Sequence, residues 1–336
     1  MLREPSQGFA QIPPGGSLKF NKRSVLIVVA LTTTIVYFCI ALATDAPRMY
    51  QALHQMGWTG CSLVLGLSAA NYILRYRRWQ LYIERLGHYL PPLRHFLYYI
   101  GGFAFTVSPA KSGELLRSLY MRGHGVSYSQ CVAAIYVERL LDLFSLTILA
   151  SLIVAQHASF IPLILGVLII ALALVIASCQ SWVPGFLEIF ATRFNSKAAR
   201  VIFGLANLTR ASRSLLRAQP LMIGLAVGLA AWGAEGCGFL IICNSFHLSI
   251  SAPVAIGIYS TSLLAGSAAF FLPAGIGGME VVMSALLVSQ GAALKTAVIA
   301  TLLCRLATLW FAVLLGISAL STVELMDRRR HIGEMP

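Results

Sequence analysis

The strongest constraint on this chain is a series of nine apolar runs, each 15 to 28 residues long, joined by short polar connections. A helix that crosses a bilayer needs about 17–25 predominantly apolar residues. Only 11% of the residues are charged, compared with about 25% in soluble domains. The runs are residues 24–43, 58–74, 96–110, 131–155, 160–177, 221–244, 252–272, 276–290 and 296–323. We therefore predict an all-α integral membrane protein and exclude a soluble catalytic domain.

Positively charged residues give the expected orientation. Lys and Arg concentrate in residues 1–23, 75–95 and 180–220, whereas residues 44–57, 156–159 and 245–251 contain one basic residue, Arg48. Because cytoplasmic loops carry the excess of Lys and Arg, we expect an inner-membrane protein with both termini in the cytoplasm. The expected domains are a cytoplasmic tail (1–23), a transmembrane domain (24–323) with a basic cytoplasmic loop (180–220), and a second cytoplasmic tail (324–336).

Two of the runs, residues 96–110 and 276–290, have 15 residues each and are too short to cross a bilayer alone. We expect a re-entrant hairpin broken at Pro109 and a second one, of opposite sense, broken at Pro273. The fold class predicted is six crossing helices plus two re-entrant, proline-broken hairpins in an inverted repeat. Glycine, alanine and proline coincide between residues 102–110 and 266–274, which supports the repeat. The competing interpretation is chance similarity between two Gly/Ala/Pro-rich stretches.

Several charged residues lie within or beside the apolar runs. Each costs about 2.5–3.5 kcal/mol on membrane-insertion scales, so a partner or a function is expected. Glu138 and Asp142 share a helix face, and Arg139 is spaced to pair with Asp142. The others are Lys111, Glu114, Arg117, Glu235, Glu280 and Arg305. Two interpretations remain open: mutual neutralisation that holds helices in register, or a polar cavity whose arginines bind phosphate.

A second basic group recurs at steps of three and four residues in the 180–220 segment. Its members are Arg193, Lys197, Arg200, Arg210, Arg213 and Arg217. Amphipathic helices on the anionic leaflet are one interpretation. Positive-inside charge with no ligand role is the other.

The sequence predicts no metal and no cofactor. The seven cysteines form no C-x-x-C pair, and the histidines form no H-x-x-x-H or H-E-x-x-H motif. The segment 275–280 lacks the spacing of a nucleotide-binding glycine motif. The net charge of +13 is attributed to cytoplasmic loops, so no nucleic-acid partner is expected.

An ordered set of motifs resembles one known family. These are P-x-x-x-G-E-x-x-R at 109–117, V-E-R-x-x-D at 137–142, P-A-G-I-G-G-M-E at 273–280 and the late Arg305. Together they are similar to the lysylphosphatidylglycerol synthase transmembrane region family over about residues 24–323. The resemblance implies a lipid-handling membrane protein. The sequence contains no soluble aminoacyl-transfer domain, so we expect a transporter-like protein rather than a synthase.

The function predicted is a flippase-like translocase for a lipid with a phosphate-bearing headgroup. Arg117, Arg139 and Arg305 are expected to contact the headgroup. The full predicted pathway is Pro109, Lys111, Glu114, Arg117, Glu138, Arg139, Asp142, Pro273, Gly277, Gly278, Glu280 and Arg305. The alternatives are a membrane-embedded transferase, with a carboxylate as general base, and a non-catalytic subunit of a lipid or glycolipid pathway. Expected partners are an anionic membrane lipid and either a second copy of the chain or a lipid-pathway enzyme.

Overall fold

The computed structural model describes residues 20–106, 113–153, 158–268 and 277–333, and every element in these ranges is helical. Pro109, Lys111 and Pro273 lie outside the described residues. The helices are α1 (Phe20–Arg85), α2 (Pro92–Gly101), α3 (Gly113–Arg122), α4 (Tyr128–Ala150), α5 (Ile161–Cys179), α6 (Trp182–Ala191), α7 (Ser196–Ser212), α8 (Ala218–Ser245), α9 (Ala252–Ala268), α10 (Gly278–Ser289), α11 (Leu294–Arg305) and α12 (Phe311–Gly333). Three short 3₁₀ turns are described: η1 (Gly102–Phe105), η3 (Ser151–Ile153) and η4 (Ala158–Phe160). A π-helical turn covers Leu306–Trp310.

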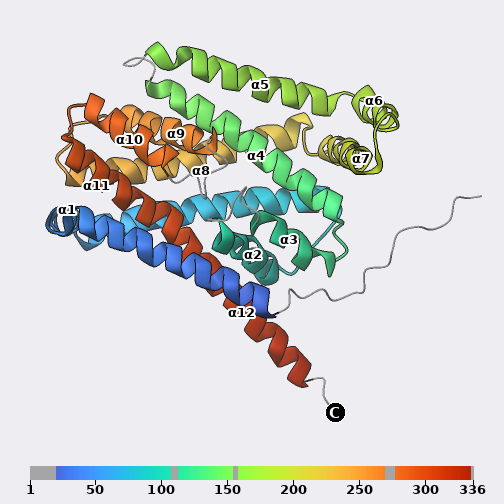
Figure 1. Ribbon diagram of the computed structural model, residues 1–336, viewed down its shortest axis with the longest axis horizontal. Helices are drawn as coiled ribbons and strands as arrows, with labels where there is room; N and C mark the ends of the chain where they lie inside the picture. Colours follow the sequence, from blue (N-terminus) through green and yellow to red (C-terminus); the bar gives the residue numbers. More distant parts are fainter. Residues whose placement is uncertain (1–19, 107–112, 154–157, 269–276, 334–336) are drawn as a thin grey trace, which may run out of the picture.

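Helix α1 contains two of the predicted apolar runs. Its ribbon turns back on itself, with a blue arm and a cyan arm (Figure 1). Pro47 lies inside the helix, and Gly57 has a φ of 62°. That left-handed conformation interrupts a right-handed helix and is accessible to glycine at little cost. Gly57 thus lies between the two apolar runs, at the connection that the sequence predicts.

The second arm of α1 corrects the predicted loop at residues 75–95. The helix continues to Arg85, and Arg75 and Arg78 are buried rather than exposed to the cytoplasm. A charged side chain is stable inside a membrane protein when oppositely charged groups pair with it. Arg75 and Arg78 therefore do not contribute to the positive charge of a cytoplasmic loop, because both are buried inside the fold.

The two largest hydrophobic clusters among the described residues make up most of the core. One joins residues of α4 and α8–α11, including Phe239 and Tyr259, and the other joins α1, α2, α4 and α12, including Trp79 and Tyr99. Helix α4 contributes to both, and it lies between α5 and the deeper helices in Figure 1. It begins with a capping box in which the Ser127 hydroxyl accepts from the Gln130 N–H and the Gln130 side chain accepts from the Ser127 N–H. This cap satisfies two backbone donors that the first helical turn leaves open.

The apolar helices are those of a multi-pass membrane protein. Among the described residues, Ala218–Ser245 and Leu294–Arg328 are each long and apolar enough to cross a bilayer, and α5 with α6 adds a third candidate if the bent pair is one span. Shorter apolar helices cover Ala252–Ser267 and Gly278–Ser289. Helix α4 has membrane length but carries Glu138, Arg139 and Asp142. The six crossings and the inverted repeat stay predictions.

The segment 180–220 is largely helical. Helix α6 packs against α7, and the bend between Ile164–Cys179 and Trp182–Ala191 is 87°. Lys197, Arg200 and Arg210 lie on α7, whereas Arg193 lies between the two helices and Arg213 and Arg217 lie in the turn that leads to α8. All six basic side chains are exposed.

Gly316 gives a direct test of this packing. A Cβ built there would lie 2.2 Å from the Ala104 backbone nitrogen, so α12 reaches η1 only because Gly316 has no side chain. We expect Gly316→Ala to lower the melting temperature of the detergent-solubilised protein by several degrees, since overpacking costs about 1–3 kcal/mol. Gly166→Ala on α5 is the matched control, because nothing lies within 4 Å of its Cβ position. Equal shifts for the two variants would contradict this packing.

Candidate functional site

The site is built around two carboxylates of α4. Glu138 and Asp142 are four residues apart, so they project from one face of the helix. Their exposed fractions are 0% and 4%. Ionised carboxylates buried to this degree require compensating charge and hydrogen bonds.

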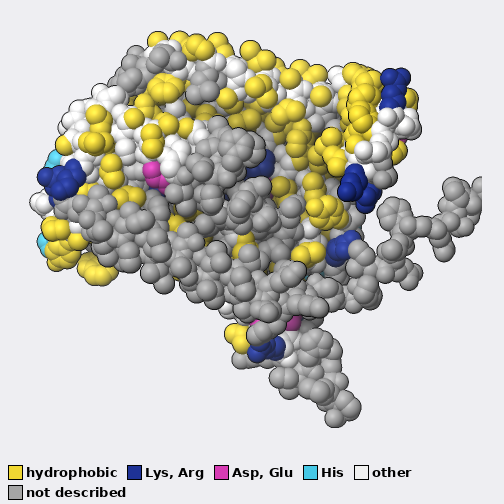
Figure 2. Space-filling model, viewed as in Figure 1, with side chains coloured by type: hydrophobic (Ala, Val, Ile, Leu, Met, Phe, Trp, Pro, Cys, Tyr) yellow, Lys and Arg dark blue, Asp and Glu magenta, His cyan; other side chains and the backbone are white. Residues whose placement is uncertain are grey.

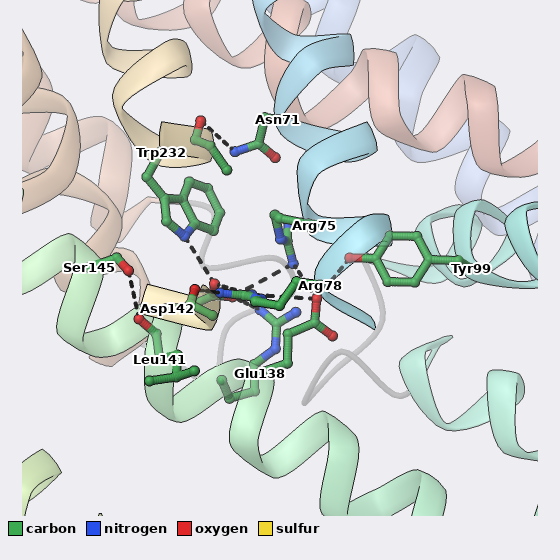
Figure 3. A network of polar contacts seen from close by, with 12 residues as sticks. Asn71, Arg75, Arg78, Tyr99, Glu138, Leu141, Asp142, Ser145 and Trp232 are labelled. Carbon is green, nitrogen blue, oxygen red and sulfur yellow. Dashed lines mark hydrogen bonds and ion pairs between the residues drawn. The ribbon is translucent and has the colours of Figure 1, made fainter. Parts of the chain in front are cut away.

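Four arginines from three helices surround the two carboxylates, and Figure 3 labels two of them, Arg75 and Arg78, beside Glu138 and Asp142. Arg78 Nη2 lies 2.6 Å from Asp142 Oδ1 and 3.6 Å from Glu138 Oε1. Arg75 Nη2 lies 3.8 Å from Glu138 Oε1 and 3.7 Å from Asp142 Oδ2. Arg117 Nη1 donates to Glu138 Oε2 at 3.2 Å, and Arg139 Nη1 lies 3.3 Å from Asp142 Oδ2. The predicted Arg139–Asp142 pair is confirmed, and one carboxylate pair links α1, α3 and α4.

Neutral donors complete the cluster. The Tyr99 hydroxyl donates to Glu138 Oε1 at 2.7 Å, and Trp232 Nε1 donates to Asp142 Oδ1 at 3.1 Å. The Arg117 guanidinium carbon lies 3.9 Å from the centroid of the Tyr99 ring, within the range of a cation–π contact. These contacts extend the network to α2 and α8.

The cluster is rich in guanidinium groups. Among the described side chains, four arginines contact two carboxylates. Guanidinium groups bind carboxylate and phosphate oxygens through charge-assisted hydrogen bonds. The arrangement is therefore suited to an anion.

A cavity of about 100 Å³ lies beside this cluster. Arg75, Arg139 and Arg305 line it, together with one carboxylate, Glu235. Its other walls are mainly aromatic and apolar, and they include Tyr72, Phe103, Trp232, Tyr259, Leu263 and Met279. The cavity thus combines three guanidinium groups with apolar walls, which is the pattern of a site for an amphipathic anion.

Arg305 comes from α11 on the other side of the cavity. Its Nε donates to Glu280 Oε1 at 2.8 Å, and Glu280 Oε2 accepts from the Gly277 N–H at 2.8 Å. Gly277 has a φ of 96°, a backbone conformation that glycine adopts without strain. Glu280 therefore closes the first turn of α10 and orients Arg305.

A π-helical turn follows Arg305 directly, at Leu306–Trp310. Thr308 and Leu309 of this turn line the cavity, and the Tyr72 hydroxyl donates to the Thr308 carbonyl. Single π-helical turns within α-helices occur frequently at functional sites.

Glu235 differs from the other buried carboxylates. It is 4% exposed and accepts a short hydrogen bond from the Tyr259 hydroxyl. None of the ion pairs within the described residues includes Glu235. It is therefore a carboxylate that faces the cavity with a neutral hydrogen-bond partner.

The predicted site residues whose side chains are described fall into three groups. Arg139 and Arg305 line the cavity, whereas Arg117, Glu138 and Asp142 lie in the cluster and do not line it. Glu280 and Gly277 support Arg305, with Gly278 as the first residue of α10. Helix α3 includes Glu114, whose side chain lies outside the described residues, as do Pro109, Lys111 and Pro273.

Sequence reasoning missed Arg75, Arg78, Trp232 and the role of Glu235 with Tyr259. A signal for the two arginines was present, because Asn71, Arg75 and Arg78 follow one another at steps of four and three residues. That spacing places them on one helix face. In the described residues, no group of three or more His, Cys, Asp or Glu side chains is placed to hold a metal ion.

These features define a multi-pass helical membrane protein with an arginine-rich internal site. The model of the lysylphosphatidylglycerol synthase transmembrane region matches residues 25–316, so the chain belongs to this family. The family connects it with membrane domains of lipid metabolism or transport. No curated protein sequence matches the chain.

Arg78 and Arg77 test the energetic role of the cluster. Arg78 is buried and pairs with Asp142, whereas the neighbouring Arg77 is exposed and donates only to Gln80 among the described residues. We expect Arg78→Met to reduce the stability by about 3–5 kcal/mol, because it leaves Asp142 with less compensating charge. Arg77→Met should change it by less than about 0.5 kcal/mol. Thermal unfolding in detergent measures both, and a similar small effect of the two variants would contradict the role of the cluster.

Proposed function

We propose that this protein moves a phosphate-bearing lipid between the two leaflets of the inner membrane. The observation that supports this most strongly is the cavity lined by Arg75, Arg139 and Arg305. Guanidinium groups bind phosphate oxygens through paired hydrogen bonds. Because the cavity lies among apolar helices, a lipid can keep its acyl or prenyl chains in the bilayer while its headgroup occupies the polar interior.

The helix pairs around the cavity support a pathway through the membrane. Helix α2 with η1 precedes α3, and α9 precedes α10, and each pair is joined through a segment that contains a proline, Pro109 or Pro273. Phe103 and Thr106 of the first pair and Leu263, Gly266 and Met279 of the second line the same cavity. We propose that the pairs are the two re-entrant hairpins, oppositely oriented among six crossing helices. Both termini then lie in the cytoplasm.

The three cavity arginines differ in their ion-pair partners, and we propose that they also differ in role. Arg75 and Arg139 belong to the carboxylate cluster, and Arg305 is oriented by Glu280. A phosphate between them would be contacted by arginines of α1, α4 and α11. Of the four arginines that pair with Glu138 and Asp142, Arg139 is the most exposed, with 31% of its side chain accessible. We therefore propose that Arg139 makes the first contact with an entering headgroup.

One observation favours a second function. Glu235 faces the cavity and is oriented by Tyr259, a geometry that suits a general base in a membrane-embedded transferase. The two functions differ in their product: translocation leaves the lipid chemically unchanged, whereas transfer adds or removes a group.

Transport in proteoliposomes tests the proposal. We expect the wild-type protein to move the headgroup of a labelled phospholipid or a short polyprenyl phosphate across the bilayer. Arg139→Gln should slow this movement at least about tenfold, because a charge-assisted hydrogen bond to phosphate contributes about 1.5–3 kcal/mol. Arg122→Gln, an exposed substitution at the end of α3, should leave the rate unchanged.

Failure of the folded wild-type protein to move either lipid would contradict translocation. Mass spectrometry of the same lipids after incubation with membrane extract then tests the transferase function. A mass change that is lost in Glu235→Gln would favour that second function.

A further inference from the structure

A second basic site lies outside the central cavity, between the end of α5 and the start of α8. A pocket of about 530 Å³ is lined by Cys179, Arg210, Arg213, Ser214, Leu216 and Arg217. Cys179 is the last residue of α5, Arg210 belongs to α7, and the other four form the turn that leads to α8. None of these residues lines the central cavity.

The position of the pocket matches the level of lipid phosphates. Helix α5 has 19 residues and no charged one, and α8 is long and apolar enough to cross a bilayer. The ends of such helices mark the boundary between the hydrocarbon core and the headgroup region. A pocket between the end of one and the start of the other therefore lies at the headgroup level.

The surroundings of the pocket are apolar on the membrane side. Trp182 and Phe186 of α6 have exposed fractions of 63% and 55%, and Ile169, Ile170 and Ile176 of α5 are also exposed. Figure 2 shows dark blue Lys and Arg side chains beside a yellow hydrophobic surface at the end of the molecule where α6 and α7 lie. Aromatic side chains next to basic ones are typical of segments at the membrane interface.

The charge of the pocket favours an anion. Three of its six lining residues are arginines and none is acidic. Arg210 Nη2 pairs with Glu188 Oε1 at 2.8 Å, which fixes α7 against α6. No ion pair among the described residues involves Arg213 or Arg217. The Ser214 side chain adds a hydroxyl group that can donate a hydrogen bond.

We propose that this pocket binds the phosphate of an anionic phospholipid from the surrounding leaflet. Arg213 and Arg217 contact the phosphate, and the acyl chains lie along the exposed surface of α5 and α6. The lipid holds the α6–α7 helix pair against the headgroup layer and is a bound lipid rather than the transported one. This site does not depend on the transport function.

Cys179 provides a local measurement of occupancy, because it lines the pocket and its side chain is exposed. Maleimide alkylation of Cys179 in the purified full-length chain in detergent, followed by mass spectrometry of the peptide, reports access to the pocket. We expect phosphatidylglycerol to slow the alkylation at least about tenfold, because each of the two arginines adds to the affinity for an anionic headgroup. Phosphatidylcholine and inorganic phosphate at equal concentration should give little protection.

Two double variants complete the test. Arg213→Gln with Arg217→Gln should remove the protection by phosphatidylglycerol, whereas Lys197→Gln with Arg200→Gln on the exposed part of α7 should retain it. Unchanged alkylation without lipid, and slow reaction of the buried Cys131, Cys243 and Cys304, would establish that the variants are folded. Protection that persists without Arg213 and Arg217, or equal protection by phosphatidylcholine, would overturn the site. Equal protection by inorganic phosphate would overturn the assignment to a lipid.

Discussion

The pairing of Glu138 and Asp142 with arginines is the interaction on which the rest of this structure depends. Two carboxylates buried in an apolar protein are unfavourable unless cations lie within a few ångströms. Arg75 and Arg78 of α1, Arg117 of α3 and Arg139 of α4 supply that charge. Since these partners come from three helices, the cluster fixes α1, α3 and α4 relative to one another. The helices therefore cannot separate without leaving buried charges uncompensated.

Two arginines of the cluster connect this structural role with the site. Here two carboxylates face four arginines among the described residues, and two of those arginines also line the cavity. Arg305 reaches the cavity from α11 through its own pair with Glu280. The positive charge of the cavity thus comes both from the Glu138–Asp142 cluster and from the separate Arg305–Glu280 pair.

The sequence was sufficient to predict the class of fold and part of the site. The apolar runs located α5, α8 and α9 because a membrane helix is uniform in composition over its length. Arg139 with Asp142 was predictable because both lie on one helix, where spacing determines distance. The family resemblance on the ordered motifs was also confirmed, over residues 25–316.

Contacts between distant segments could not be predicted in the same way. Arg75 and Arg78 follow an apolar run, so charge alone placed them in a loop, and their partner Asp142 is 64 residues further along the chain from Arg78. Trp232 and Tyr259 lie within apolar runs, and only the fold brings their polar atoms to Asp142 and Glu235. The spacing of residues within one helix therefore predicts which side chains share a face. Contacts between side chains of different helices depend on how the helices pack and cannot be predicted from that spacing.

The central claim is that the cavity between Arg75, Arg139 and Arg305 holds the phosphate of a lipid. Photo-crosslinking with a phospholipid that carries a photoreactive group beside its phosphate tests this most directly, with the modified peptides mapped by mass spectrometry. The account predicts crosslinks to cavity residues such as Tyr72, Leu263 and Thr308, which Arg139→Gln reduces. Crosslinks confined to the outer surfaces of the helices, and unchanged by that substitution, would contradict it.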